Sequence, residues 1–252
     1  MSENLQSFSK PFSYIKEPYL PSGKTAVCAV SEECGEVIEF LVGMGIEVLK
    51  VKPSRFLPQN IASHADLQIL PLGGNAIAVN SEQKEIITKL NDLGFIITET
   101  DGFTDRYPND CLLNLLIIKD SIYGNPRCLS DQLTGERKAV SVKQGYAKCS
   151  TLLIDSGHAV TDDSGISRAL TKDGIENICI TQKEIQLPGY ERGFIGGASG
   201  RISSEEIIFC GKISKTKFWP QISPMFENFR VTEIGNQTPK DFGGIVPLME
   251  IK

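Results

Sequence analysis

A fixed order of elements repeats along this chain, and the repeat limits the folds that the chain can form. Two short apolar strands joined by a turn are followed by a helix and a third strand. The clearest copy contains, in order, a strand over 64–72, a Gly-Gly turn, a strand over 76–80, a helix over 81–93 and a strand over 95–100. Ser81 can cap this helix, Gly94 can end it, and its apolar face contains Ile86, Ile87, Leu90 and Leu93.

Three further copies follow at intervals of roughly 40 residues. The second reads NDCLLNLLIIKDSIYGN, PRCLSDQLTGE and KAVSVKQG; the third reads KCSTLLIDSGHAVTDD, SGISRALTKDG and NICITQ; the fourth reads FIGGASGRISSEEIIFCG, SPMFENF and RVTEIG. A Lys-Asp turn joins the first two strands of the second copy, and a Ser-Gly turn joins those of the third. In the fourth copy, Ser223 and Pro224 suit the start of the helix.

The N-terminal region lacks only the first strand of a unit. TAVCAV, SEECGEVIEFLVGMG and EVLKVK supply its second strand, helix and third strand, and GGIVPLMEI at residues 243–251 can supply the missing one. We therefore predict an α/β fold, a closed five-bladed α/β-propeller of ββαβ units completed by the C-terminal strand. Residues 1–23 form an N-terminal extension, and residues 24–252 form a single domain. Closure buries strand edges that an open α/β sheet, the competing interpretation, leaves exposed; the ββαβ order argues against a doubly wound sheet.

Composition narrows the range of partners. The 252 residues are 40% apolar and 23% charged, which is enough for a sizeable core. The net charge of −5 comes without any basic block, so we expect no nucleic-acid partner. The run LLNLLII is far shorter than the roughly 20 residues of a membrane span, and the N-terminal segment lacks the apolar centre of a secretion signal. We therefore expect no membrane association and a cytoplasmic location; the oligomeric state is left open.

The seven cysteines indicate a reduced protein without metal. Their number is odd, no CxxC pair occurs, and several lie in apolar segments such as AVCAV and NICIT. With only two histidines in the chain, the pattern argues against a structural zinc site. We expect no metal and no cofactor.

The five-unit ring resembles the pentein fold, also called the guanidino-group-modifying-enzyme fold, over residues 24–252. Arginine deiminases, agmatine deiminases, dimethylargininases and amidinotransferases share this fold, as does a non-enzymatic ribosome anti-association factor. The nearest resemblance is to an uncharacterised bacterial family with this fold. In the enzymes a cysteine attacks the guanidinium carbon, the histidine of an HxD motif moves protons, and carboxylates hold the cation. The sequence HAD, with His64 and Asp66, is similar to that motif.

Two departures from the family pattern leave the function open. The family's nucleophile lies near the C-terminus, but here that region reads KDFGGIVPLMEIK and has no cysteine. The family's acidic motif normally precedes its HxD motif, whereas here HAD already lies in the first full unit. The resemblance implies a hydrolase or transferase acting on a guanidinium or amidine compound, that is, a small cationic molecule, in the central channel. The alternative is a non-catalytic member that binds a metabolite or a macromolecule.

Aligning the units on their hairpin turns predicts which side chains face the channel. Two residues apart on a strand, His64 and Asp66 point to the same side; the competing interpretation is an Asp–His pair that ties loop ends together. Cys149 is the thiol candidate, with a buried structural cysteine as its alternative. We take His64, Asp66 and Cys149 as the candidate catalytic residues. The residues predicted at one height are Asp66, Leu112, Cys149 and Gly197.

A second set of positions predicts binding residues. Asp110 falls at the level of His64, although it can also cap a turn after Pro108 and Asn109. One step further in, all four units carry a polar residue, which suggests a mutual hydrogen-bond layer or a ligand floor. These residues are Gln68, Asn114, Thr151 and Ser199. An error of one residue in the alignment would turn a strand's side chains to the opposite face.

Two other motifs have structural interpretations. His158 follows a glycine in a hairpin turn and is expected to be structural. GFIGGASGR exposes consecutive backbone N–H groups that can bind an anion, but it lacks the spacing of known phosphate loops. Close packing or a strand bend is the favoured role of its glycines.

Overall fold

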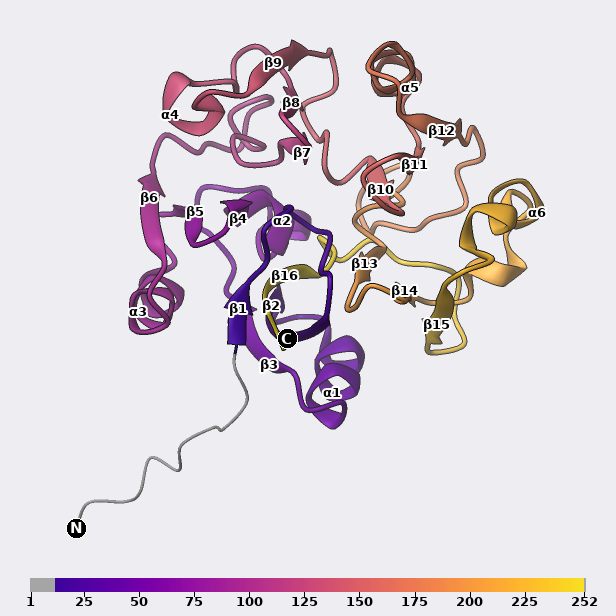
Figure 1. Ribbon diagram of the computed structural model, residues 1–252, viewed down its shortest axis with the longest axis horizontal. Helices are drawn as coiled ribbons and strands as arrows, with labels where there is room; N and C mark the ends of the chain where they lie inside the picture. The colour runs from indigo at the N-terminus through magenta and orange to yellow at the C-terminus, as the bar shows by residue number, and fades with distance from the viewer. Residues whose placement is uncertain (1–11, 252) are drawn as a thin grey trace.

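The computed structural model describes residues 12–251, which form five small β-sheets (Figure 1). In four sheets the first two strands pair antiparallel and the third pairs parallel with the second, as the ββαβ order predicts. These sheets are β4 (Ile69–Gly73), β5 (Ala76–Asn80) and β6 (Ile96–Thr100); β7 (Leu116–Ile118), β8 (Ser121–Gly124) and β9 (Lys138–Ser141); β10 (Thr151–Leu153), β11 (His158–Thr161) and β12 (Glu176–Cys179); β13 (Ser199–Arg201), β14 (Glu206–Cys210) and β15 (Arg230–Ile234).

The C-terminal strand completes the remaining sheet, as predicted. Its strands run in the order β1 (Phe12–Tyr14), β16 (Val246–Ile251), β2 (Lys24–Ser31) and β3 (Glu47–Val51). β16 pairs antiparallel with β2, with Val246 opposite Ala29. β1 comes from the predicted N-terminal extension, so part of that segment belongs to the sheet. Glu250 of β16 also accepts hydrogen bonds from the backbone N–H groups of Ser22 and Gly23.

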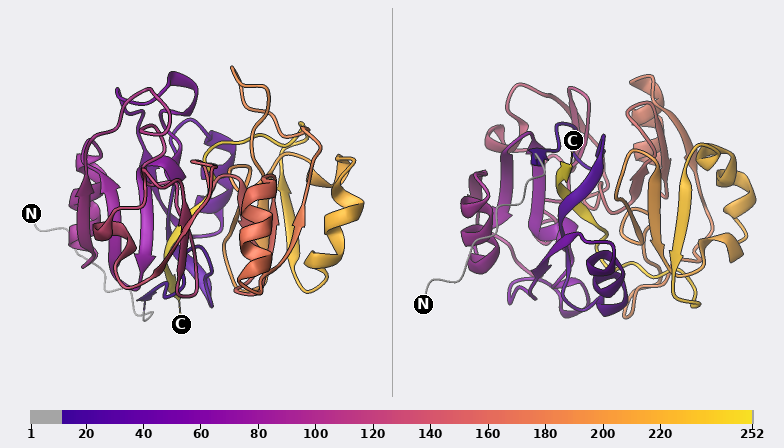
Figure 2. Two further views of the ribbon diagram at one scale, coloured as in Figure 1. Left: turned by 90° about the horizontal axis from the view of Figure 1, so that it is seen from above. Right: turned by 60° about the horizontal axis from the view of Figure 1, so that its bottom comes forward.

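The five sheets are arranged around a common centre (Figure 1). β16, β4, β7, β10 and β13 lie innermost, while the third strand of each sheet and the helix of each unit lie outside. Figure 2 shows α5 and α6 on the outer side of their sheets. The outer helices are α1 (Gly35–Gly43), α3 (Lys84–Asp92), α4 (Asp131–Thr134), α5 (Ser164–Lys172) and α6 (Trp219–Ile222). Short 3₁₀ turns occur at Gln59–Ile61, Ile213–Lys215 and Ser223–Phe226.

One apolar cluster connects the inner strands of four units. It includes Ile69 of β4, Leu116 of β7, Leu153 of β10 and Leu248 of β16, all of which are buried. Burying side chains from different units in one cluster is what holds these separate small sheets together, because a three-stranded sheet alone buries little apolar surface. No helix within residues 12–251 has the length and apolar character needed to cross a membrane.

Three units begin with a turn at the place where a strand was predicted. Residues 65–68 form the short helix α2 (Ala65–Gln68), and β4 begins only at Ile69. Similar turns precede β10 and β13, where the backbone N–H of Ser150 bonds to the Tyr146 carbonyl and that of Ala198 to the Phe194 carbonyl. The prediction of a strand over 64–72 is therefore wrong over 64–68, and the two-residue alternation used to place His64 and Asp66 does not apply to them.

Two helix starts also differ from prediction. Ser81 does not cap α3, because its hydroxyl bonds to Asp101 and the helix begins at Lys84; Gly94, with φ of 83°, ends this helix as predicted. In the last unit the helix begins at Trp219, before the predicted Ser223. Pro220 lies in its first turn, where a missing N–H leaves no bond unmade.

Candidate active site

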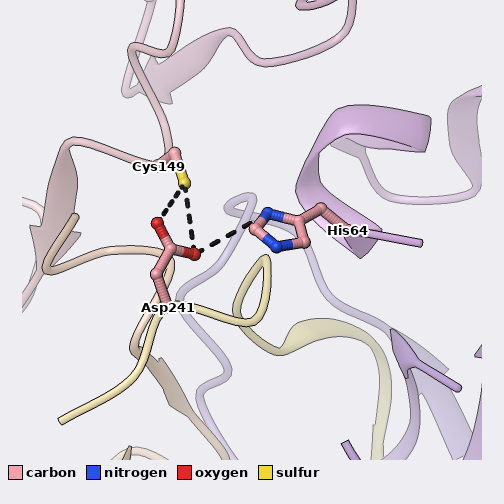
Figure 3. Close-up of side chains that lie close together, drawn as sticks. All are labelled: His64, Cys149 and Asp241. Carbon is pink, nitrogen blue, oxygen red and sulfur yellow. Dashed lines mark hydrogen bonds and ion pairs between the residues drawn. The ribbon is translucent and has the colours of Figure 1, made fainter. Parts of the chain in front are cut away.

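Three side chains from distant parts of the chain meet at the centre of the molecule (Figure 3). His64 precedes α2, Cys149 lies in the turn before β10, and Asp241 lies in the segment before β16. The Cys149 thiol donates to Asp241, at 3.5 Å from Oδ2 and 3.7 Å from Oδ1, and the His64 Nδ1 lies 3.7 Å from Asp241 Oδ1. All three residues are at most 4% exposed. The arrangement places an acid–base group, a thiol and a carboxylate within reach of one another.

Backbone N–H groups hold the Asp241 carboxylate in place. Phe194 N donates to Oδ2 at 2.9 Å, and Gly243 N donates to Oδ1 at 3.0 Å. A buried carboxylate needs such donors, since burying a charge without partners is costly. The bonds leave Asp241 oriented toward Cys149 and His64.

Glycines permit this close assembly. A side chain at Gly197 would collide with the Asp241 carboxylate and the Cys149 sulfur, and one at Gly243, where φ is 79°, would collide with His64. Gly197 belongs to the GFIGGASGR motif, so close packing accounts for this glycine, as the favoured interpretation of the motif predicts.

Asp66 is a second carboxylate beside the thiol. It is fully buried, its backbone N–H donates to the Gly243 carbonyl, and neither carboxylate oxygen has a hydrogen-bond partner. Burial raises the pKa of Asp66 to about 6, although the charges of Lys148 and His64 oppose the shift. No ion pair joins Asp66 to His64 among residues 12–251, where the histidine instead faces Asp241. Two carboxylates, of which one is unpartnered, thus surround a single thiol.

The two carboxylates affect the thiol directly. Burial, followed by the negative charges of Asp241 and Asp66, raises the pKa of Cys149 well above its ordinary value. The thiol is therefore protonated at neutral pH in the protein without ligand. A cation placed between thiol and carboxylates would reverse the sign of this effect.

Two adjoining cavities reach this cluster, and His64, Leu187 and Asp241 line both. The first has a volume of about 190 Å³ and a mostly apolar wall, with Glu191 and Arg192 as its other charged residues. Its remaining lining residues are Ile61, Leu67, Tyr146, Cys149, Tyr190 and Phe194. The second, of about 180 Å³, is polar and includes Glu33, Cys34 and Lys240. A small molecule with an apolar body and a charged head matches the first cavity.

The predicted polar layer does not exist as a shared network. Gln68, Asn114, Thr151 and Ser199 are all buried, but each bonds to its own surroundings rather than to the other three. Thr151 donates to Thr161, and Ser199 to the Ile195 carbonyl. Asn114 has a positioning role, since it donates to the Asp66 carbonyl and accepts from the Cys149 N–H, both at 2.9 Å. Substrate contact by these residues stays a prediction.

The other predicted residues lie further out. Asp110 accepts a hydrogen bond from the Tyr146 hydroxyl, and the Tyr146 ring lines the apolar cavity, so Asp110 stands behind that wall. His158 lies near the surface, within 2.9 Å of Asp155 at the other end of β11's hairpin turn. Asp241 was missed by sequence reasoning. Its position in KDFGG, just before the strand where the resembling enzymes carry their nucleophile, was the available signal.

The buried Asp66 carboxyl predicts a pH-dependent stability. Its pKa is about 6 in the folded chain against an ordinary value of 3.8, so the native state holds the proton more tightly than the unfolded state. The contribution of this group is therefore fully present below pH about 4 and is lost as the pH rises through about 6. Relative to wild type, the free energy of unfolding of Asp66→Asn should rise by about 3 kcal/mol between pH 3.5 and pH 7. Urea unfolding of both proteins at the two pH values measures this difference. A constant difference between the two proteins would contradict the burial argument.

Comparison with known proteins gives one family and a set of similar structures. Residues 29–246 match the model of a family of unknown function, DUF6873. No curated protein matches. An inosamine-phosphate amidinotransferase from Streptomyces griseus has a TM-score of 0.63 at 9% identity, over 93% of this chain and 97% of that one. C. jejuni agmatine deiminase has a TM-score of 0.53 at 12% identity, over 92% of both chains.

A third similar structure is DDAH from Pseudomonas aeruginosa in complex with citrulline. It has a TM-score of 0.54 at 10% identity, over 92% of this chain and all of that one. As their names state, the first two are an amidinotransferase and an agmatine deiminase. At this level of identity the likeness shows the fold, and the fold of this chain is the pentein fold, as the sequence predicted.

Proposed function

The chain belongs to the DUF6873 family, whose function is unknown, and from the geometry of its site we propose that it is a thiol-dependent hydrolase or transferase. Its substrate is a small molecule with a guanidinium or amidine group. The observation that carries the proposal is the Cys149 thiol, hydrogen-bonded to the buried carboxylate of Asp241, beside His64 and the unpartnered Asp66.

Charge and shape favour this substrate class. A guanidinium ion is planar, stays positively charged, and presents N–H donors that match carboxylates. Asp241 lines the cavities and offers carboxylate acceptors there, and the unpartnered Asp66 adds negative charge beside the thiol from a fully buried position. The rings of Phe194 and Tyr146 line the approach and can stabilise a cation by its attraction to aromatic faces. The apolar wall suits an alkyl or aryl substituent on the cation.

The bound cation also prepares the nucleophile. Its positive charge lowers the pKa of Cys149, which the two carboxylates otherwise raise. Cys149 transfers its proton to His64, and Sγ forms a bond to the central carbon. The bond between that carbon and the leaving nitrogen then breaks, and His64 returns the proton to the departing ammonia or amine. A ring nitrogen of His64, the sulfur of Cys149 and a carboxylate oxygen of Asp241 lie within 4.8 Å of one another. Small movements of these side chains would bring the atoms close enough for the proton transfers.

A second half-reaction releases the enzyme. Water, or an acceptor amine in a transferase, attacks the carbon bound to Sγ, and His64 takes the proton that the attacking group loses. The carbon–sulfur bond breaks, its electron pair returns to sulfur, and His64 passes its proton to Cys149. In hydrolysis the new C–OH group also loses its proton to solvent, which leaves a neutral carbonyl. Hydrolysis leaves a ureido product, whereas transfer leaves a new amidino compound.

The proposal is tested with a panel of guanidinium compounds. Purified protein is incubated with arginine, agmatine, methylated arginines and alkylguanidines, and the release of ammonia, urea or amine is measured. We expect turnover of at least one compound, and a loss of about 10²–10⁴-fold in kcat/KM in His64→Ala. His158→Ala is the matched control, since His158 lies near the surface at a hairpin turn and is expected to leave activity unchanged. Equal losses in both variants would exclude His64 as the acid–base group.

One alternative has an observation of its own. The raised pKa of Cys149 and the cysteine-free segment before β16 favour a protein that binds a cation without converting it. Calorimetric binding of a guanidinium compound, with no product after prolonged incubation, would support this non-catalytic function over the enzyme.

A further inference from the structure

Tyr19 has an unusual backbone conformation close to the site. Its φ is 66°, a region that bulky side chains rarely adopt, and its ring is buried. Such strain persists only where the surrounding structure enforces it, and it is common at functional positions. Hydrogen bonds before and after Tyr19 fix the segment: Ile15 N donates to the Leu248 carbonyl, and Ser22 N donates to the Glu250 carboxylate. Tyr19 is therefore held against the centre of the molecule.

The Tyr19 ring contacts a buried lysine. The Lys148 Nζ lies 4.8 Å from the ring centroid and 3.3 Å from the Gly196 carbonyl oxygen. Lys148 itself is buried and directly precedes Cys149. Both contacts, an aromatic face and a carbonyl, are favourable for an ammonium ion removed from water.

Lys148 makes no ion pair, although a buried carboxylate is close by. No carboxylate oxygen lies within 4.0 Å of its Nζ in the part of the chain that the structure describes. Hydrogen bonds nevertheless bring the two segments together: Asn114 donates to the Asp66 carbonyl and accepts from the N–H of Cys149, the residue after Lys148. The charge of Lys148 acts on Asp66 across this contact. Opposite charges in a low-dielectric interior attract strongly, and a direct pair is their expected state unless other contacts hold them apart.

We infer that Tyr19 is a positioning residue whose ring holds the Lys148 ammonium away from Asp66, so that no direct ion pair cancels the negative charge that Asp66 presents to a cationic substrate at Cys149. The inference rests on the proposed function for the identity of the substrate, but not for the separation of the two charges. The ring is the active part of Tyr19, because its hydroxyl has no hydrogen-bond partner. Loss of the ring lets Lys148 bond to Asp66 and cancel the negative charge that attracts the substrate cation.

The first test needs no substrate. The groups facing Asp66 are Lys148, His64, Asp241, Cys149 and Tyr19. In Tyr19→Leu, a direct pair with Lys148 keeps Asp66 ionised, so the part of the fall in stability that Asp66 causes between pH 4 and 6 should disappear, whereas the part from the buried Asp162 should remain. Tyr19→Phe keeps the ring and should retain the wild-type pH dependence. The readout is urea unfolding of each protein from pH 3.5 to 7, with Asp66→Asn as the reference that lacks the titrating group. An unchanged pH dependence in Tyr19→Leu would overturn the inference, whether or not the protein is an enzyme.

The second test measures cation binding. The dissociation constant of agmatine, or of whichever guanidinium compound wild type binds, should rise at least tenfold in Tyr19→Leu and less than twofold in Tyr19→Phe. KM should follow the dissociation constant, while kcat changes little. Lys148→Met combined with Tyr19→Leu should restore binding, because the competing ammonium is then absent. A purely structural role for Tyr19 predicts no such rescue, and absence of rescue would contradict the inference. If wild type binds no guanidinium compound, the proposed function is wrong, and the pH experiment still tests the inference about Tyr19.

Discussion

Replacing Cys149 with serine should lower kcat/KM for the guanidinium substrate by a factor of about 10³ or more. A serine hydroxyl in this apolar, carboxylate-lined position stays protonated and is a far weaker nucleophile than a thiolate. The substitution is nearly isosteric, so calorimetric affinity for the substrate should remain within a few fold of wild type. Loss of turnover with retained binding is the signature expected of a nucleophile.

Cys179→Ser is the matched control for this prediction. Cys179 ends β12, an outer strand, and is only partly buried. Its replacement should leave kcat/KM unchanged. Mass spectrometry of the wild type mixed rapidly with substrate should also show an adduct on the peptide containing Cys149 and none in Cys149→Ser. Full activity of Cys149→Ser would mean that the chemistry occurs elsewhere.

Replacing Leu248 with alanine should lower the free energy of unfolding by about 2–5 kcal/mol. Leu248 is 2% exposed and lies on β16 in the cluster that joins the inner strands of four units. Its removal leaves a cavity at the place where the C-terminal strand completes the first sheet. Urea unfolding of the purified variant measures the effect.

Ile96→Ala is the matched control for Leu248→Ala. Ile96 begins β6 and is 67% exposed, so removal of the same number of carbon atoms should change stability by about 0.5 kcal/mol or less. Similar losses in the two variants would show that β16 contributes no more to the core than an outer strand, contrary to the structure.

The local apolar pattern was sufficient to predict the architecture. Short runs of β-branched residues bounded by turn residues, followed by segments with helical periodicity, indicate ββαβ units because each element must bury one face. The same argument identified GGIVPLMEI as the missing strand, and β16 pairs with β2. It failed at the start of three units. Residues 65–68, Ala-Asp-Leu-Gln, alternate apolar and polar like a strand, yet all four are buried in a short helical turn.

Because residues 64–68 do not form a strand, the argument that placed the site residues was wrong, although some of those residues do lie together. His64 and Cys149 come together although neither lies on a strand. Asp66 is near the thiol, whereas the predicted polar layer divides into separate local bonds. The direction of a side chain in a turn depends on its backbone bonds, such as that from Asp66 N to the Gly243 carbonyl, and these come from another unit.

The order of elements, the five units and the strand supplied by the tail follow from the sequence alone, because burial of apolar faces acts through neighbours along the chain. Only the tertiary structure decided that Asp241 faces Cys149 and His64, and that the Tyr19 ring contacts the Lys148 ammonium. These residues come from four different units or segments. Their contacts depend on distances between units, which local periodicity does not determine.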